Sequence, residues 1–166
     1  MNVILFDNPT IRQDLLPFTF TRPVADIRVG ILTISEKWEK YLKVTPTFSS
    51  EPYLSNKFPS HYTADNFWIN GALCPNADLV SAIHRLAPGD AIAKDNMILA
   101  VRTPDDEVPE VITGTCTEFV HPVTLIDQVW KIYQYNGAQI KADFELITHG
   151  RKSAAITDIH TKVYSP

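Results

Sequence analysis

A short apolar run, a long segment rich in proline and arginine, and a helical pattern follow one another at the start of this sequence. The apolar run covers residues 2–7 (NVILFD) and is continuous rather than alternating, which is typical of a parallel strand buried on both faces. The helical pattern covers residues 30–42, has Thr33 and Glu36 at capping-box spacing, and predicts one helix. Its apolar residues at helical spacing are Ile31, Ile34, Trp38 and Leu42. A strand, a long loop over residues 7–30 and a helix are the opening unit of an α/β domain.

Strand and helix patterns also alternate further along the chain. Apolar runs predict a strand at 66–71, a hairpin within 90–103 that turns at Lys94–Asp95–Asn96, and a strand at 110–120. Helical spacing predicts a short helix at 53–57 and a longer one at 76–86 that begins with Asn76 as its cap. This alternation predicts one α/β sandwich with a mixed, mostly parallel sheet.

The last third of the chain is expected to contain two helices. The first covers residues 124–135, with Thr124 as its cap and Asn136–Gly137 as its end. The second covers residues 138–150. The three tryptophans lie in apolar patterns and are expected in the core; they are Trp38, Trp68 and Trp130.

Composition limits the classes of protein to which the chain can belong. Its 166 residues, 45% hydrophobic and 20% charged, suit one globular domain with a core. The formal net charge of −4 argues against a general nucleic-acid-binding protein. No apolar run approaches the ~20 residues that span a bilayer, and the N-terminus lacks the pattern of a signal peptide. The expected location is therefore cytoplasmic, with Cys74 and Cys116 as free thiols.

Three arginines share the segment 7–30: Arg12, Arg22 and Arg28. Guanidinium groups bind phosphate oxygens through two parallel donors and stay charged at every working pH, so the loop is a candidate phosphate site at the rim of the sheet. An alternative stays open from the spacing alone. The arginines could instead pair with the aspartates interleaved among them, which are Asp7, Asp14 and Asp26.

Other chemical motifs are weaker. Asp143 and Glu145 are paired carboxylates of the kind that can bind magnesium, whereas Asp105, Asp106 and Glu107 lie between prolines and are expected in a solvated loop. The sequence contains no P-loop, GxGxxG, HExxH or GxSxG motif.

Four segments resemble a known family. They are NVILFDNP at 2–9, LLPFTFTRPVADIRVGILTISEKW at 15–38, WINGALCPN at 68–76 and ADFELITHGRKS at 142–153. Together they resemble divergent sugar-phosphate nucleotidyltransferases, similar to the N-terminal half of bifunctional N-acetylglucosamine-1-phosphate uridylyltransferase/acetyltransferase proteins. The resemblance implies a Rossmann-like nucleotidyltransferase domain over residues 1–153. Residues 154–166 would then be a tail or linker toward a C-terminal β-helix domain, with a trimer in the longer protein.

The same resemblance implies a reaction and its substrates. A sugar 1-phosphate attacks a nucleoside triphosphate, with UTP or dTTP expected, and a nucleotide-sugar and pyrophosphate form in a magnesium-dependent step of cell-envelope precursor synthesis. Arg12 would match the arginine of the family's G-T-R-L-x-P-L-T loop, and Thr19 would match its final threonine. Arg22 would stand near the usual P-K, Arg28 would replace a lysine before the first helix, and Asn70–Gly71 would match the G-D turn. On this match the expected catalytic residues are Arg12 and Arg22, and the expected substrate-binding residues are Thr19, Arg28, Asn70 and Gly71.

The sequence also departs from the family pattern. Asp7–Asn8–Pro9 replaces the glycine-rich start of the loop, and Ala72 stands where the family's metal-binding aspartate is expected. Asp143 is the candidate substitute as metal ligand. Two other functions stay open, and Ala72 motivates the first of them. One is a catalytically silent module that binds a nucleotide or nucleotide-sugar in a longer acyltransferase-type protein. The other is a purely structural assembly element, which an exposed apolar patch would support.

Overall fold

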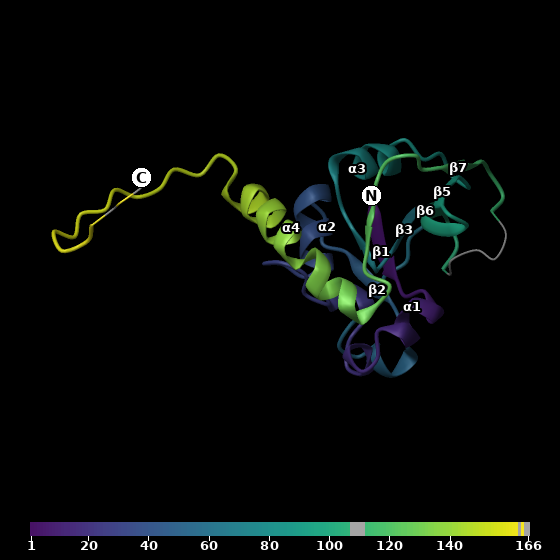
Figure 1. The fold of residues 1–166 in the computed structure, drawn as a ribbon. Coiled ribbons are helices and arrows are strands. Elements are labelled where there is room, and N and C mark those ends of the chain that lie inside the picture. Colours follow the sequence, from purple (N-terminus) through teal and green to yellow (C-terminus); the bar gives the residue numbers. More distant parts are fainter. Residues whose placement is uncertain (107–111, 163, 165–166) are drawn as a thin grey trace.

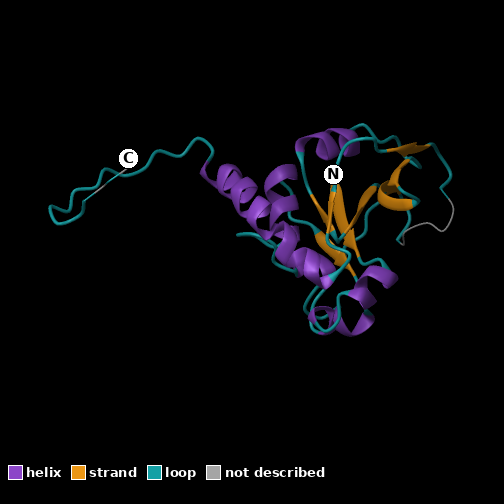
Figure 2. Ribbon diagram, viewed as in Figure 1, coloured by secondary structure: helices purple, strands orange, loops and turns teal. Residues whose placement is uncertain are grey.

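The computed structural model describes residues 1–106, 112–162 and 164, and its centre is a six-stranded sheet (Figures 1 and 2). The strand order is β2 (Thr47–Ser49), β1 (Asn2–Phe6), β3 (Asn66–Asn70), β6 (Met97–Thr103), β5 (Ala91–Lys94) and β7 (Cys116–Glu118). β1 pairs in parallel with β2 and β3, and β5 pairs in parallel with β7, whereas β6 is antiparallel to both of its neighbours. The expected α/β fold with a mixed, mostly parallel sheet is confirmed.

A second, two-stranded sheet pairs β4 (Leu73–Cys74) with β8 (Thr124–Leu125). The helices are α1 (Pro9–Asp14), α2 (Ile34–Leu42), α3 (Ala77–His84) and α4 (Val129–Thr148). Short 3₁₀ turns cover Phe18–Phe20, Val24–Asp26 and Pro52–Leu54. Residues 150–157 contain no helix or strand, and in Figure 1 this yellow-green segment leads away from the end of α4.

Several local predictions are confirmed by hydrogen bonds. Thr33 caps α2 with a complete capping box, because its Oγ1 accepts from Glu36 N at 3.2 Å and its own N–H donates to Glu36 Oε2 at 2.7 Å. Asn76 caps α3 by accepting from Leu79 N at 2.9 Å. Asp95 and Asn96 both have positive φ, as a tight hairpin turn requires.

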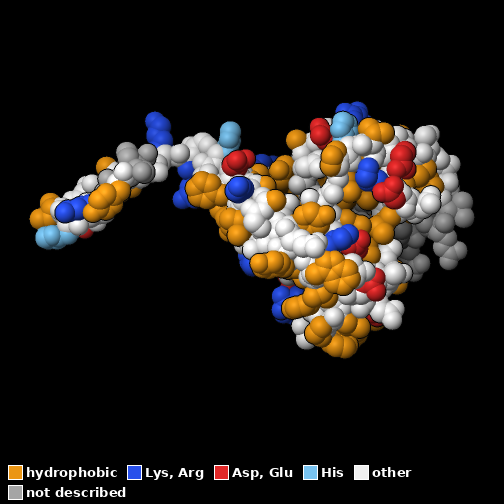
Figure 3. All heavy atoms as spheres, in the orientation of Figure 1, with side chains coloured by type: hydrophobic (Ala, Val, Ile, Leu, Met, Phe, Trp, Pro, Cys, Tyr) orange, Lys and Arg blue, Asp and Glu red, His pale blue; other side chains and the backbone are white. Residues whose placement is uncertain are grey.

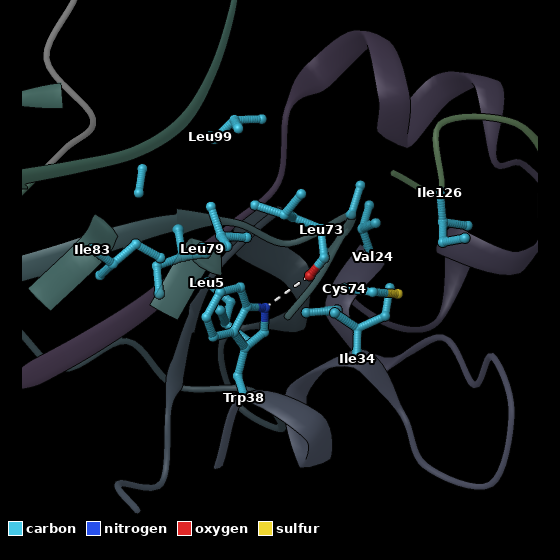
Figure 4. Close-up of a cluster of buried hydrophobic side chains, with 14 of the residues drawn as sticks. Leu5, Val24, Ile34, Trp38, Leu73, Cys74, Leu79, Ile83, Leu99 and Ile126 are labelled. Atoms are coloured by element: carbon cyan, nitrogen blue, oxygen red, sulfur yellow. Dashed lines mark hydrogen bonds between the residues drawn. The ribbon is translucent and has the colours of Figure 1, made fainter. Parts of the chain in front are cut away.

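The core packs around Trp38, which is completely buried on α2. Its indole Nε1 donates to the carbonyl oxygen of Leu73 at 2.8 Å (Figure 4), so the ring is both packed and hydrogen-bonded. Leu79 and Ile83 come from α3 and Leu5 from β1. Trp68 is also buried.

Four predictions about elements were wrong or incomplete. The segment 7–30 is not wholly irregular, because Asn8 caps the short helix α1 through its side-chain oxygen. The expected helix at 53–57 is only the 3₁₀ turn at Pro52–Leu54. The short edge strand β2 was not expected. The strand expected at 110–120 is confined to β7; Glu107 and residues 110–111 lie outside the described part of the chain.

The largest correction concerns α4, which is one helix of 20 residues rather than two helices separated at Asn136–Gly137. Thr124 lies in β8 and does not cap a helix. Val129, Ile132 and Tyr135 pack against the core from the inner face of α4, and this tertiary packing overrides the low helix propensity of glycine. Trp130, expected in the core, is exposed on the outer face.

Within the described residues, no helix combines the length and the apolar character needed to cross a membrane.

Candidate functional site

The carboxyl ends of three parallel strands meet at one rim of the sheet. β1, β2 and β3 end at this rim, where ligands of α/β sheets commonly bind. The segment that carries the three arginines begins directly after β1. At Gly71 an added Cβ would stand 3.1 Å from the carbonyl oxygen of Phe6, and Gly71 N donates to that oxygen at 2.8 Å. Glycine therefore lets the ends of β1 and β3 approach closely.

Arg12 lies buried beneath this rim and binds groups of the protein itself. Its Nη1 donates to Asp7 Oδ2 at 2.7 Å and to the carbonyl oxygen of Arg22 at 3.2 Å. Its Nη2 donates to the carbonyl oxygen of Thr19 and, at 2.9 Å, to the hydroxyl of Tyr53. The sequence left open that the arginines pair with interleaved aspartates. The structure shows such a pair at Arg12, with Asp7, and a longer one at Arg22, whose Nη1 lies 3.8 Å from Asp26 Oδ2.

Asp7 is the counter-charge in this network. Its Oδ1 accepts from Val24 N at 2.9 Å, and its Oδ2 accepts from the hydroxyl of Ser50 at 2.5 Å as well as from Arg12. Burial raises the pKa of the Asp7 carboxyl above its ordinary value, although these hydrogen bonds and the Arg12 charge oppose the shift. Through Arg12, which binds the carbonyl oxygens of Thr19 and Arg22, this network fixes the backbone of that part of the segment.

Thr19 was expected to contact substrate, but its side chain is buried and its hydroxyl donates to the carbonyl oxygen of Arg12 at 2.8 Å. Asn70 is buried too, and its Nδ2 donates to the carbonyl oxygen of Ile98 at 3.3 Å. Its Oδ1 accepts from Ala72 N at 3.0 Å. The side chains of Thr19 and Asn70 therefore bind backbone groups and hold the chain around the site in its conformation.

Arg22 and Arg28 differ from Arg12 because their side chains reach solvent. The side chain of Arg22 is 46% exposed and lies 3.8 Å from Asp26 Oδ2. The side chain of Arg28 is 55% exposed and lies 3.6 Å from Glu36 Oε2, and its Nη1 donates to the carbonyl oxygen of Ile31. Exposed ion pairs of this kind are weak and typically contribute about 0–1 kcal/mol. Both guanidinium groups can therefore exchange their carboxylates for another anion.

Arg22 and Arg28 line the same cavity, which has a volume of about 730 Å³ and lies between their segment and α4. Phe18 and Ile27 form part of the apolar wall on one side of the cavity. Ile132 and Tyr133 of α4 form part of the opposite wall. Mostly apolar walls with a few charged groups are usual for small-molecule sites. The sequence did not indicate that α4 supplies one wall of this cavity.

Asp143, the expected metal ligand, lies on the inner face of α4 and is buried. Its Oδ1 forms an ion pair with Lys37 Nζ, and its Oδ2 accepts from Ile31 N at 2.8 Å and Leu32 N at 3.1 Å. Both oxygens therefore already have donors, and an ammonium group stands where a cation would have to bind. This donor set does not fit a magnesium site.

Metal-ligating side chains do not gather elsewhere in the described ranges, where no group of three or more His, Cys, Asp or Glu side chains is placed to hold an ion. Lys37, the buried ion-pair partner of Asp143, was not expected from the sequence. Lys37 lies in the charged stretch SEKWEK, which is typical of an exposed helix face. Only its position one residue before Trp38 could have indicated that its side chain points toward the core.

A second cavity, of about 620 Å³, lies directly on the rim. Asp7, Asn8 and Ser49 line it from the strand ends, and Asp95 and Asn96 line it from the β5–β6 turn. Its charged lining residues are acidic, so it suits a polyphosphate less well than the cavity of Arg22 and Arg28.

The chain was compared with curated proteins and with models of protein families. No curated protein matches the chain closely enough to count as a relative. A family model described as sugar nucleotidyl transferase matches residues 3–152, which is nearly the whole chain and includes every residue of the two cavities. The chain therefore belongs to the sugar nucleotidyl transferase family.

Proposed function

We propose that this chain transfers a nucleotidyl group from UTP or dTTP to a sugar 1-phosphate, and that the phosphates bind in the cavity of Arg22 and Arg28. The observation that carries the proposal is the placement of two half-exposed guanidinium groups at one cavity of about 730 Å³. Guanidinium groups present paired donors to phosphate oxygens and do not lose their charge.

The reaction requires positioning rather than covalent participation by the protein. A phosphate oxygen of the sugar 1-phosphate forms a bond to the α-phosphorus of the triphosphate. The bond from that phosphorus to the oxygen bridging the α- and β-phosphates breaks, and its electron pair leaves with pyrophosphate. In-line alignment and compensation of negative charge supply the catalysis in such transfers, and Arg22 and Arg28 provide cationic groups for both.

The other residues of the segment act as positioning residues in this proposal. Arg12 holds the carbonyl oxygens of Thr19 and Arg22. At the opposite end, Asn136 Oδ1 accepts from Gly30 N at 2.8 Å, and Asp143 binds the next two backbone N–H groups. The segment with the two exposed arginines is therefore held at both ends, by Arg12 and by α4.

The family resemblance implies magnesium in the reaction. Because the donors around Asp143 do not fit a magnesium ligand, we assign no described residue to the ion and derive no step through it. Magnesium enters the test as a component of the assay.

Pyrophosphate release by the purified chain tests the proposal. UTP, dTTP, CTP, GTP and ATP are each combined with a panel of sugar 1-phosphates, with and without magnesium. Release that needs both substrates is expected with UTP or dTTP. Arg22→Ala and Arg28→Ala should each lower kcat/KM by about 100-fold, since each removes a cationic group from the transferring phosphates.

Arg85→Ala is the matched control, because Arg85 is an exposed arginine at the end of α3, outside this cavity. It should leave kcat/KM unchanged. Equal losses in all three variants, or full activity in Arg22→Ala and Arg28→Ala, would contradict the proposed site.

A second candidate function is a catalytically silent module that binds a nucleotide or nucleotide-sugar. The observation that favours it is the burial of Ala72, which occupies the position of the family's expected aspartate and has only 1% of its surface exposed. Calorimetric titration with UTP and with a nucleotide-sugar separates the two functions. Binding that Arg22→Ala and Arg28→Ala weaken, without pyrophosphate release on any substrate pair, would select the silent module.

A further inference from the structure

The outer face of α4 carries a stripe of apolar residues that no described part of the chain covers. Its members are Trp130, Tyr133, Ile140 and Phe144, which are 59%, 88%, 41% and 59% exposed. With Gly137 they repeat at intervals of three, four, three and four residues, the spacing by which one helix packs along another. Figure 3 shows hydrophobic side chains along α4.

This outer stripe, defined as residues 130, 133, 137, 140 and 144, is separate from the inner face of α4. The inner face packs on the core through Val129, Ile132 and Tyr135 and binds α2 through the Lys37–Asp143 ion pair. A helix that needed only to cover the core would carry polar residues on its outer face. Apolar residues on both faces indicate a second packing partner.

Gly137 points to close approach by that partner. It lies near the middle of α4, and a Cβ added there would meet nothing within 4 Å. Glycine weakens a helix interior, and no contact with residues 1–106, 112–162 or 164 requires it at this position. A helix surface without a Cβ allows another backbone to come close, as small residues do where helices cross.

The stripe is also nearly symmetric about Gly137. Trp130 and Phe144 each lie seven residues from it, and Tyr133 and Ile140 lie four and three residues from it. Turning the helix end for end therefore places Trp130 of one copy on Phe144 of another and Tyr133 on Ile140. A self-complementary surface of this kind is what a twofold symmetric dimer requires.

We propose that two copies of this chain associate through their α4 helices, antiparallel, with Gly137 at the crossing point. A fully covered aromatic side chain buries 150–250 Å², so the stripes of two copies together supply on the order of 1,000 Å², about the size at which specific interfaces begin. Tyr133 also lines the cavity of Arg22 and Arg28. The second copy thus packs at the edge of that cavity.

The test is sedimentation velocity of the full chain from about 1 to 500 μM. A dimer that forms with rising concentration is expected. Phe144→Glu should raise the dissociation constant at least tenfold, because it places a charge in the apolar contact. Val120→Glu is the matched control, since Val120 is an exposed apolar residue outside α4, and it should leave the dissociation constant unchanged.

Gly137→Gln separates association from folding. Glutamine is the better helix former, so this variant should unfold at the same or higher temperature at low concentration and yet associate more weakly. A chain that stays monomeric at 500 μM, or a dimer that persists unchanged in Phe144→Glu and Gly137→Gln, would overturn the proposal. Neither result depends on nucleotidyl transfer.

Disulfide formation tests whether the two α4 helices are antiparallel. Gln134→Cys and Lys141→Cys are made separately in a Cys116→Ser background. Residues 134 and 141 flank the outer stripe and lie on opposite sides of Gly137. An antiparallel pair brings them together, so a mixture of the two variants should cross-link faster than either alone. Faster cross-linking within each single variant would contradict the antiparallel arrangement.

Discussion

Lys37 on α2 and Asp143 on α4 form an ion pair that is almost completely buried. Asp143 also accepts the backbone N–H groups of Ile31 and Leu32, so one carboxylate joins two helices to the end of the segment that carries Arg28. Asp143, which the sequence suggested as a metal ligand, therefore holds α2, α4 and residues 31–32 together.

Removing one partner of this pair should destabilise the fold strongly. Lys37→Met leaves an uncompensated carboxylate in the core and should lower the free energy of unfolding by about 3–5 kcal/mol. Lys141→Met is the control, because Lys141 is an exposed lysine on α4, and it should change stability little. Urea unfolding measures both. If the two variants lose equal stability, the buried pair does not hold these elements together.

Arg12→Ala should lower the free energy of unfolding, and any loss of activity should follow from that loss of stability. It removes the charge paired with the buried Asp7 and five hydrogen bonds to Asp7, Ser50, Thr19, Arg22 and Tyr53. The expected loss is again about 3–5 kcal/mol, read from the urea midpoint. Arg12→Lys keeps the charge but not the planar fork, and it should recover only part of the loss. An Arg12→Ala variant with unchanged stability and no turnover would instead assign Arg12 a direct role with substrate.

Gly30 should tolerate no side chain. Its φ is +90°, and an added Cβ would stand 2.6 Å from Asp143 Oδ2 and 2.8 Å from the carbonyl carbon of Gln139. Gly150 has a φ of +72° with nothing within 4 Å of its Cβ position. Gly150→Ala should therefore cost at most the backbone term of about 1–2 kcal/mol, and Gly30→Ala should cost clearly more. Thermal unfolding measures both variants. Gly30→Ala suffers a steric clash as well as backbone strain, whereas Gly150→Ala suffers backbone strain alone.

Replacing Ala72 by the family's expected aspartate should not create a metal site. Ala72 is buried next to Leu73 and Cys74 of the core, so Ala72→Asp would place a carboxylate there without a designed partner. The expected loss of stability is about 3 kcal/mol or more, with no recovery on adding magnesium. Ala87→Asp, at an exposed position after α3, should be close to neutral. Magnesium-dependent stabilisation of Ala72→Asp would contradict this expectation.

The two cysteines should differ in reactivity. Burial raises the pKa of the Cys74 thiol to about 12, so at neutral pH almost none of it is the reactive thiolate. Cys116 is exposed on β7. Iodoacetamide at pH 7.5, followed by mass spectrometry, should label Cys116 in the folded chain and both cysteines in urea. Labelling of Cys74 at the same rate without denaturant would show that its strand opens readily.

Local patterns in the sequence were enough to predict much of the fold. The capping box of Thr33 and Glu36, the Asn76 cap and the Asp95–Asn96 turn depend on contacts within a few residues, and all three occur as expected. The continuous apolar runs correctly identified β1 and β3, because strands buried on both faces need apolar residues throughout. The family resemblance came from the same segments.

Tertiary structure alone decided which arginines reach solvent and that α4 is one continuous helix packed on the core. Arg12, Arg22 and Arg28 stand in one segment among interleaved aspartates, and nothing local distinguishes the one that is buried by contacts with Asp7, Ser50 and Tyr53. The helix α4 continues through Asn136–Gly137 because the core and the Lys37–Asp143 pair hold it on both sides of that point. Those contacts join residues about a hundred positions apart, and the sequence pattern of either partner contains no record of the other.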